Sequence, residues 1–388
     1  MKWFLTIALL FITVTAGVCL WYEDSSSDFI IKKPISPEKD FWSENDDILI
    51  YLEAITRIKN HALYLDSEIK RKAIIQETLK SYVEKADRFA AYLTADEFKK
   101  WKGAQGDQYV GIGMEIEKDR GGQIVCLPYP GSPAEQAGIR AGDRLISIDG
   151  VPVRDRSILA IGTMARGEQG TRVKLLITST GEESREISIS RSAVSLENVT
   201  ISHSENIPVI KILAFTRDTK LKLENALTNI DKNSPLVIDL RGNAGGDLFA
   251  AIDSAKLFLD DHKQIVSIKT RLGIEKYQSG DFAVNTSSPL FLWQDEGTAS
   301  AAEVFIAALT SNKRAVSIGK QSFGKGTKQE VFELSDGSAL FITNGYLQTP
   351  DAIFFDGKGL NPDYPVESPK PKTLDFLVKV NELLTTRK

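Results

Sequence analysis

The segment at residues 296–329 constrains this chain more than any other part of its sequence. It reads EGTASAAEVFIAALTSNKRAVSIGKQSFGKGTKQ, so Ser300 precedes an apolar, helix-like run, and Lys325 lies between glycines ahead of a strand-like run. A serine nucleophile needs a base, and none of the three histidines lies near a glycine turn or a strand end. A lysine can serve instead if burial lowers its pKa, because a neutral amine accepts protons. The segment therefore predicts a Ser/Lys hydrolase.

Lys325 has an alternative interpretation in a nucleotide-binding loop. Residues 319–325 fit G-x-x-x-x-G-K, the start of a phosphate-binding loop. The next residue, however, is Gly326 where that loop needs Ser or Thr, and the chain continues into a strand-like hairpin instead of a helix. The pattern therefore favours a general base, whose pKa must fall from about 10.4 to about 7 through burial.

Ser300 also has a simpler interpretation, because with Glu303 it forms a helix-capping box. The two interpretations are compatible. A nucleophile at a helix start lies at the positive end of the helix dipole. The backbone N–H of Ala301 would then point at a developing oxyanion.

Strand-like and helix-like runs alternate from about residue 196 onwards. The strand-like runs are IPVIKI, LVIDL, QIVSIKT, PLFLW and AVSI, and LVIDL is a continuous apolar run of the kind that is buried on both faces. The alternation predicts an α/β core with helices packed on a mixed, mostly parallel sheet. A hairpin, EVFELSDGSALFIT, follows with Asp336-Gly337 at its tip.

A glycine-rich loop, RGNAGG, occupies residues 241–246 between LVIDL and the next helix-like run. This position suits anion binding by backbone amides. The spacing differs from the G-x-G-x-x-G fingerprint of dinucleotide-binding loops.

Residues 109–191 switch to short strand-like runs with glycine turns. The run GSPAEQAGIRAGDRLISIDGVPV at residues 131–153 resembles the central part of a PDZ domain, which accepts the end of a peptide as an added strand. Upstream, Val110, Gly111, Ile112 and Gly113 fit a loop that presents backbone N–H groups to a terminal carboxylate. An ordinary strand bulge at these glycines is the alternative.

The first hundred or so residues contain an apolar run, a polar linker and helix-like stripes. Residues 3–22 carry no charge and match the about 20 residues of a membrane span. They fit both an uncleaved anchor and a cleaved signal peptide, and either would export the rest of the chain. Apolar residues at helical spacing predict a small helical module, with a capping box at Thr94 and Glu97.

Composition excludes some classes of function. A net charge of −4 gives no basic footprint for nucleic acid. Cys126 is the only cysteine beyond residues 1–22, so neither a disulfide framework nor a thiolate metal site is expected. We expect no metal and no organic cofactor.

Four motifs together resemble the C-terminal processing peptidases, the PDZ-containing Ser/Lys proteases of peptidase family S41. They are, in order, DLRGNAGG at 239–246, GTASAAE at 297–303, FGKG at 323–326 and GLNPD at 359–363. The family often has proline in place of Ala244 and serine in place of Ala302, neither of which is a catalytic position. The resemblance spans about residues 109–367.

The resemblance implies a catalytic set. It consists of the nucleophile Ser300, the general base Lys325, Gln329 as the group that holds the lysine amine, and the oxyanion-hole amides of Ala301 and Gly246, with Gly245 as the alternative. Arg166 lies in a turn that, in this type of PDZ domain, often faces the protease body. It would couple peptide binding to the active site, whereas a solvated arginine is the simpler interpretation.

The resemblance also implies an organisation and a function. The expected segments are a leader (1–22), a linker (23–39), a helical module (40–105), a PDZ domain (106–191), an α/β catalytic core (192–367) and a C-terminal helical tail (368–388). We expect an exported, extracytoplasmic serine endopeptidase of the bacterial periplasm or cell envelope that captures apolar C-terminal tails of proteins. An adaptor or activator protein, a homo-oligomer and a membrane-anchored N-terminus are compatible with the sequence. The alternative is a catalytically inactive or latent PDZ scaffold that binds tails of envelope proteins.

Overall fold

The structure is a computed structural model of the chain. It describes residues 31–32, 46–65, 67–87, 89–103, 108–118, 122–129, 131–154, 156–179, 181–195, 197–280, 287–368 and 371–386. The predicted leader lies outside these ranges, as does most of the predicted linker. Within them, no helix combines the length and the apolar character needed to cross a membrane.

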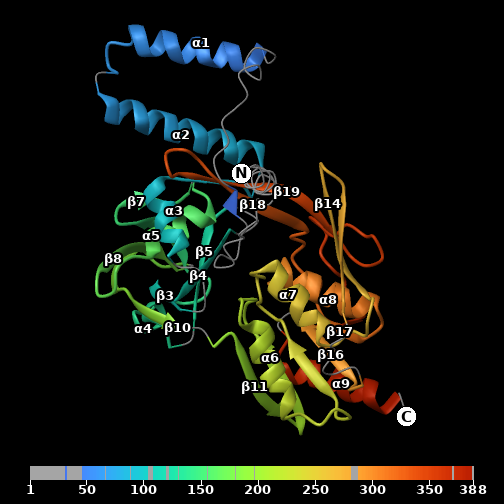
Figure 1. Ribbon diagram of the computed structural model, residues 1–388. Helices are drawn as coiled ribbons and strands as arrows, with labels where there is room; N and C mark the ends of the chain where they lie inside the picture. Colours follow the sequence, from blue (N-terminus) through green and yellow to red (C-terminus); the bar gives the residue numbers. More distant parts are fainter. Residues whose placement is uncertain are drawn as a thin grey trace, which may run out of the picture.

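The described helices lie in four regions of the chain. They are α1 (Asp46–His61), α2 (Glu68–Ala86) and α3 (Ala95–Lys102), then α4 (Pro133–Gln136) and α5 (Ile158–Ala165), then α6 (Thr219–Thr228), α7 (Leu248–Lys256) and α8 (Ala301–Ser311), and finally α9 (Thr373–Thr386). Helix α3 starts with the predicted capping box, in which the Glu97 carboxylate accepts hydrogen bonds from the backbone and side chain of Thr94. In Figure 1, α1 and α2 extend from the rest of the molecule as an arm.

The described strands form four sheets. They are β1 (Ile31–Lys32), β2 (Ala91–Leu93), β3 (Gln108–Gly111), β4 (Met114–Lys118), β5 (Ile124–Pro128), β6 (Arg144–Ile148), β7 (Val151–Pro152), β8 (Arg172–Thr178), β9 (Arg185–Ser190), β10 (Ser192–Ser195), β11 (Val199–Ser204), β12 (Ile207–Ile212), β13 (Leu236–Asp239), β14 (Gln264–Thr270), β15 (Ile274–Gln278), β16 (Leu290–Gln294), β17 (Ala315–Gly319), β18 (Thr327–Glu333), β19 (Ala339–Gln348) and β20 (Tyr364–Pro365).

The central sheet has the order β11-β12-β13-β16-β17-β20. All its neighbours pair in parallel except β11 and β12, which are antiparallel. Every residue of β13 and β16 is buried, as expected of apolar strands covered on both faces. The predicted mixed, mostly parallel α/β core is therefore confirmed.

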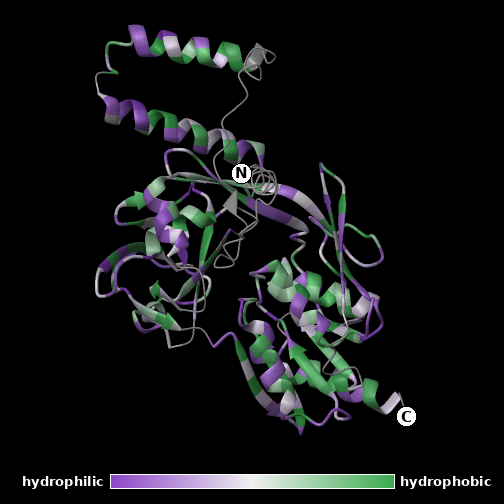
Figure 2. Ribbon diagram, in the orientation of Figure 1, coloured by the Kyte–Doolittle hydropathy of each residue, from purple (hydrophilic) through white to green (hydrophobic). Residues whose placement is uncertain are grey.

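Alternate residues of the central strands feed two different cores, because successive side chains of a strand point to opposite faces. In β16, Leu290 and Leu292 pack in the core formed with α6, α7 and α8. Phe291 and Trp293 pack in the core formed with α9. Figure 2 shows apolar residues concentrated on the strands between these layers, and mixed with hydrophilic residues along the α1–α2 arm.

A second sheet has the order β1-β18-β19-β14-β15, with β2 paired to β19. We expected QIVSIKT among the strands of the α/β core, but it forms β14, which is antiparallel to both β15 and β19. The run DRFAAYLT, expected within a helical module, contains β2, whose residues are buried by pairing with β19. Both differences arise from long-range pairing that a local apolar pattern does not specify.

The small domain between β3 and β10 has its own sheet, β4-β5-β6-β8-β9, and its own core, which includes the buried Cys126. Strands β2 and β19 flank this domain in the sequence and yet pair with each other, so the domain is an insertion in the body. A fourth cluster joins α3 and β2 to α5 of the inserted domain and to the β18–β19 hairpin.

Candidate active site

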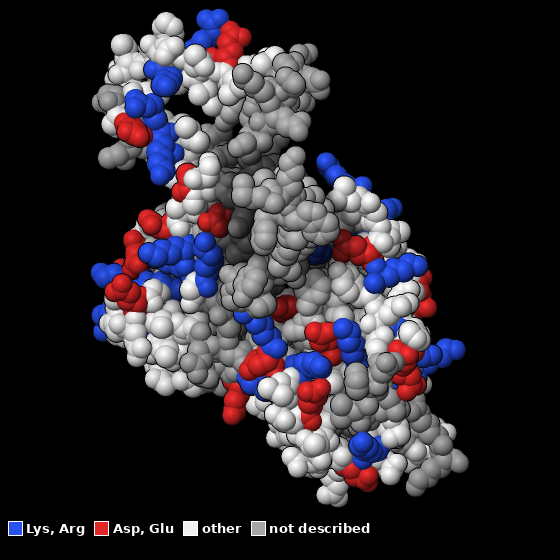
Figure 3. All heavy atoms as spheres, viewed as in Figure 1, with Lys and Arg blue, Asp and Glu red and all other residues white. Residues whose placement is uncertain are grey.

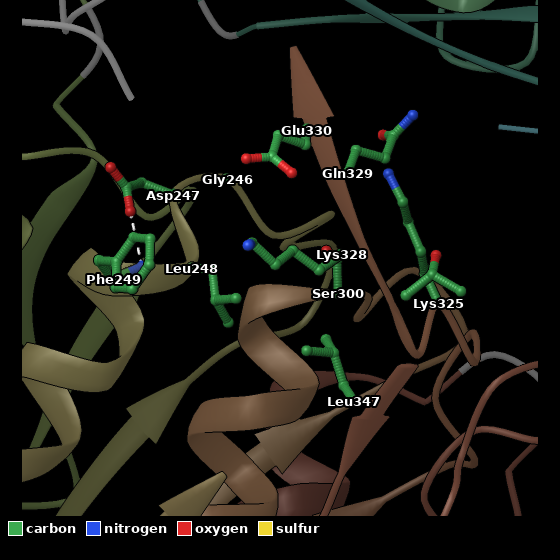
Figure 4. Close-up of a pocket in the computed structure, with 11 residues that line it drawn as sticks. Gly246, Asp247, Leu248, Phe249, Ser300, Lys325, Lys328, Gln329, Glu330 and Leu347 are labelled. Atoms are coloured by element: carbon green, nitrogen blue, oxygen red, sulfur yellow. Dashed lines mark hydrogen bonds between the residues drawn. The ribbon is translucent and has the colours of Figure 1, made fainter. Parts of the chain in front are cut away.

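Four separate segments meet at one pocket of about 90 Å³. Figure 4 shows the pocket between the loop before α7, the start of α8 and strand β18. The residues that line it are Gly246, Asp247, Leu248, Phe249, Ser300, Lys325, Thr327, Lys328, Gln329, Glu330 and Leu347. The structure therefore brings together Gly246, Ser300 and the Lys325–Gln329 segment, which come from three distant parts of the sequence.

Ser300 has an unusual backbone conformation, with φ 56° and ψ −119°. Such a conformation is strained for a residue with a Cβ atom, and it persists only where the surroundings hold it. Its N–H donates to the Glu303 carboxylate at 2.8 Å, and its carbonyl accepts from the Val304 N–H at 3.1 Å. The turn places the half-buried Ser300 side chain at the start of α8, in the pocket.

Glu303 connects the serine segment to the lysine loop. One carboxylate oxygen accepts the N–H groups of Ser300 and Lys325, and the other accepts the Gly324 N–H and the Ser322 hydroxyl. Burial raises the pKa of this carboxyl, and these hydrogen bonds oppose that rise. The sequence analysis identified Glu303 only as a helix cap, because the donors from the lysine loop lie 19 to 22 residues further along the chain.

The Lys325 amine lies 5.2 Å from the centre of the Phe89 ring. Burial holds the pKa of this amine below its ordinary value, and the charge of Asp87 opposes that shift. The cause is the one the sequence analysis required of a lysine base. Within the described residues, no hydrogen bond joins the Lys325 amine to the Ser300 hydroxyl, although both side chains line the pocket.

Gln329, like Lys325, lies next to Phe89. In Figure 4 the lysine side chain extends towards Gln329. The Gln329 amide nitrogen donates to the Phe89 carbonyl at 2.6 Å. Phe89 therefore forms one wall of the site, beside Lys325 and Gln329. Asp87 holds Phe89 in place, because its carboxylate accepts the N–H groups of Phe89 and Thr343, each at 2.9 Å. The sequence analysis did not identify Asp87 and Phe89 as residues of the site.

The glycine loop offers one unpaired amide to the pocket. The Gly245 N–H already donates to the Asn243 side chain at 2.8 Å. Phe215 pairs with the main chain on either side of Gly246, and an added Cβ at Gly246 would lie 2.1 Å from the Phe215 oxygen. Within the described part of the chain, the N–H of Gly246 has no acceptor, and neither does that of Ala301. Of the two glycine amides, that of Gly246 is therefore the one available to a ligand in the pocket.

Neighbouring polar residues hold the two loops together. Asp295 accepts the N–H of Gly242 at 2.9 Å and that of Gly297 at 3.0 Å. The Ala299 N–H donates to the Asn243 carbonyl at 2.9 Å. The glycine loop and the turn that leads to the serine are thus bonded directly to each other.

The GLNPD motif supports the lysine loop. The Leu360 N–H donates to the Ser322 hydroxyl at 2.7 Å, and that hydroxyl in turn donates to Glu303. Asp363 anchors the motif to β17 by accepting the N–H and hydroxyl of Ser317. The sequence analysis gave this motif no role, and the structure shows that it supports the loop that carries Lys325.

In the inserted domain, strand β4 is an edge strand. Of the predicted carboxylate loop at residues 110–113, Val110 and Gly111 belong to β3 and pair with β10, and only Ile112 and Gly113 form the connection to β4. The carbonyls of Ile112 and Gly113 accept N–H groups from Ala134 and Tyr129, at 2.9 and 3.0 Å. Gly113 has φ 70°, and an added Cβ would lie 2.4 Å from the Ser132 Cβ, so this position requires glycine. The loop is therefore fixed through its carbonyls beside an open strand edge.

Arg166 follows α5, and its guanidinium lies 5.1 Å from the centre of the Tyr109 ring. Burial lowers the pKa of this guanidinium, and the neighbouring Tyr109 and Tyr129 oppose the shift. Arg166 thus packs close to the 110–113 loop. The connection to the body lies at the start of α5, where Ala160 shares a core cluster with Val331 of β18.

Acidic and basic side chains are interspersed over the face shown in Figure 3. Within the described residues, no group of three or more His, Cys, Asp or Glu side chains is placed to hold a metal ion.

Comparison with known proteins identifies the family. Residues 206–366 match the model of peptidase family S41, and residues 124–178 match a PDZ domain model. A probable CtpA-like serine protease of Staphylococcus aureus (strain COL) is 32% identical over 333 residues, covering 84% of this chain and 66% of that protein. The protein of the same name from the bovine strain RF122/ET3-1 is 31% identical, covering 83% and 67%.

Two further proteins similar to this chain are named as processing proteases. The carboxy-terminal processing protease CtpA of Bacillus subtilis (strain 168) is 31% identical over 294 residues, covering 75% of this chain and 63% of that protein. The solved structure of a photosystem II D1 C-terminal processing protease has a TM-score of 0.67 and 27% identity, covering 88% of this chain and 92% of that one. The chain spans about two thirds of the length of the curated relatives it matches.

Residues from three of the four motifs meet in the pocket, and the fold matches that of a processing protease. A relative from Staphylococcus aureus is 31% identical, with 67% of its length covered. The chain therefore belongs to peptidase family S41 and carries its PDZ domain as an insertion before the protease domain.

Proposed function

We propose that this chain is an exported serine endopeptidase that captures apolar C-terminal tails with its PDZ domain and cleaves by a Ser/Lys acyl-enzyme mechanism. The observation that carries the proposal is the pocket itself, where Ser300 and the buried Lys325 lie beside the unpaired amide of Gly246. The names of the relatives support the class of reaction.

Substrate capture would use the edge of β4. An apolar tail adds to this edge as an extra strand, and its terminal carboxylate accepts N–H groups from residues 110–113. This arrangement leaves the preceding, unfolded part of the substrate free to reach the pocket.

Acylation requires the neutral form of Lys325, which burial favours by lowering the pKa of its amine. The neutral amine takes the Ser300 proton as the hydroxyl oxygen attacks the scissile carbonyl. The N–H groups of Ala301 and Gly246 stabilise the oxyanion. The protonated lysine then donates to the leaving amine. In the second half-reaction, neutral Lys325 takes a proton from water, and hydrolysis of the acyl-enzyme restores Ser300.

Gln329 would hold the lysine amine during this cycle. Its amide nitrogen is engaged by the Phe89 carbonyl, so its side-chain oxygen is the group that accepts from the amine. Proton transfer would then require the lysine side chain to move from the Phe89 ring to within hydrogen-bond distance of Ser300.

The second candidate is a latent enzyme or PDZ scaffold. The observation that favours it is the lack of a hydrogen bond between Ser300 and Lys325 in the described site. A docked tail or an activator protein would then be required to align the dyad. Export to an extracytoplasmic compartment belongs to both candidates and rests on the apolar run at residues 3–22.

The test is hydrolysis of an unfolded reporter protein with an apolar C-terminal tail, with and without EDTA, by the purified chain and by Ser300→Ala and Lys325→Ala. We expect EDTA-insensitive cleavage that both substitutions abolish without loss of folded protein. Robust cleavage by either variant would refute the Ser/Lys mechanism. Tail binding without cleavage by the wild type would favour the latent enzyme or scaffold.

A further inference from the structure

The Glu303 carboxylate is fully buried, with 0% of the residue exposed. It accepts hydrogen bonds from Ser300 N–H (2.8 Å), Lys325 N–H (2.8 Å), Gly324 N–H (2.7 Å) and the Ser322 hydroxyl (2.5 Å). The burial of a charged group is unfavourable unless hydrogen bonds replace its hydration. Four donors around one carboxylate provide that replacement.

An ordinary capping glutamate in the same chain shows the difference. Glu97 occupies the equivalent position of α3, and among the described residues its carboxylate accepts hydrogen bonds only from Thr94, three residues earlier. Glu303 makes the same local bond to Ser300 and also binds a loop that follows α8 and β17. Helix capping alone accounts for the first bond and leaves the other three unexplained.

One oxygen of Glu303 links the main chains of Ser300 and Lys325. It accepts both the N–H of the nucleophile residue and the N–H of the base residue. The two main-chain positions are therefore fixed to a single rigid group. The same bond helps to hold Ser300 at φ 56°, a conformation that needs support from its surroundings.

We propose that Glu303 is a positioning residue that sets the distance between Ser300 and Lys325 for proton transfer. This proposal rests on the proposed function, because it assigns Glu303 a role in that Ser/Lys reaction. Glu303 acts through the two main chains, and the proton passes only between the two side chains. Misplacement by about 1 Å is enough to lower a rate about a hundredfold when reacting groups must be aligned.

Glu303→Gln tests the idea because it keeps the size of the side chain. If the glutamine NH₂ replaces the oxygen near Ser300 and Lys325, it faces two N–H donors. If it replaces the other oxygen, it faces the Gly324 N–H. In either orientation the buried glutamine NH₂ group faces a backbone N–H, so at least one hydrogen bond is lost. Glu97→Gln is the matched control, since it changes the same type of cap away from the pocket.

We expect Glu303→Gln to lower kcat for the tail-bearing reporter at least tenfold, about 1.4 kcal/mol. KM should stay within twofold, because tail capture lies in another domain. The rate of Ser300 labelling by a small fluorophosphonate, which needs no peptide binding, should fall by the same factor. All rates refer to the folded fraction, measured by thermal denaturation, and Glu97→Gln should stay within twofold of the wild type.

Two results would overturn the proposal. One is a kcat for Glu303→Gln within twofold of the wild type per folded molecule. The other is an equal loss in Glu97→Gln, which would indicate a general effect of removing a helix cap. If Glu303→Gln does not fold, Glu303→Asp replaces it, because its shorter carboxylate keeps the charge but cannot span both segments. Activity in Ser300→Ala or Lys325→Ala would instead refute the proposed function itself.

Discussion

The Gln329 side chain donates a hydrogen bond to the Phe89 carbonyl across 2.6 Å, although 240 residues separate them in the sequence. Phe89 follows α2 and precedes β2, and its ring lies 5.2 Å from the Lys325 amine. The segment before the PDZ domain thus contributes a wall of the active site. A protease domain beginning at residue 206, where the family match starts, would lack that wall.

Phe89→Ala should move the pH dependence of catalysis to higher pH. Burial is the main cause of the lowered pKa of Lys325, so loss of the ring admits water and lets that pKa rise. Because the proposed base acts in its neutral form, kcat/KM should increase as pH rises through this pKa. The ascending limb of kcat/KM against pH should therefore shift upwards, with lower activity at neutral pH.

The Phe89 ring also attracts the protonated amine by about 0.5–2 kcal/mol, which raises the pKa of Lys325 and so opposes the effect of burial. Phe89→Leu separates the two effects, since leucine keeps apolar cover and lacks the aromatic face. We expect the ascending limb of kcat/KM for Phe89→Leu to lie at the same pH as that of the wild type, or at a lower pH. A limb shifted to lower pH in Phe89→Ala would contradict the prediction and make the aromatic attraction dominant.

Lys325→Met should stabilise the folded protein at pH values below the lowered pKa. The pKa is lower in the folded than in the unfolded state, so the unfolded state binds more protons between the two values. Wild-type stability therefore rises with pH through that window. The free energy of unfolding of Lys325→Met should exceed that of the wild type at about pH 6, and the difference should shrink towards pH 10.5. Denaturant titrations across this range provide the measurement. A Lys325→Met variant less stable than the wild type at about pH 6 would show that burial of the charged lysine does not destabilise the folded protein.

Removal of a single amide should distinguish the oxyanion donors. Replacement of Gly246 by glycolic acid, or of Ala301 by lactic acid, exchanges the N–H for an ester oxygen and keeps the side chain. Each should lower kcat about a hundredfold to a thousandfold. The same exchange at Gly245 is the control, because that N–H donates to Asn243 at 2.8 Å. A larger loss at Gly245 than at Gly246 would reverse the assignment.

Arg166→Ala should uncouple tail binding from cleavage. The guanidinium packs 5.1 Å from the Tyr109 ring, next to the loop at residues 110–113. Cleavage of a tail-bearing reporter should fall, while cleavage of a short peptide that does not engage the PDZ domain should persist. Arg154→Ala, at an exposed arginine of the same domain, is the control. Equal kinetics for wild type and Arg166→Ala on both substrates would remove the coupling role.

The sequence predicts much of the site because its chemistry lies in local motifs. Ser300 and Lys325 were identified from residue types and glycine turns, and both line the pocket. The resemblance favoured Gly246 and left Gly245 as the alternative, because only the structure shows the Asn243 side chain bound to one of the two amides. The choice depends on a side-chain orientation that spacing does not determine.

What the sequence does not predict depends on contacts between distant segments. Asp87 and Phe89 lie at the site because β2, which follows them, pairs with β19, whereas the sequence analysis placed this segment within a helical module. Glu303 was identified by its bond within α8, whereas its other donors come from the loop after β17. The parallel core was predictable from buried apolar runs, but the antiparallel pairing of β14 was not.

Phe376→Ala should destabilise the protein by about 3–5 kcal/mol, the usual cost of removing a fully buried phenylalanine. The Phe376 ring on α9 is 0% exposed and lies 5.4 Å from the Trp293 ring and 4.5 Å from the Arg241 guanidinium. Its loss leaves a cavity and exposes one face of an arginine that begins the glycine loop. Phe376→Leu should recover part of the loss, because it fills most of the cavity without the aromatic contact. Denaturant unfolding measures both variants, and a change below about 1 kcal/mol in Phe376→Ala would mean that α9 does not dock on the body in solution.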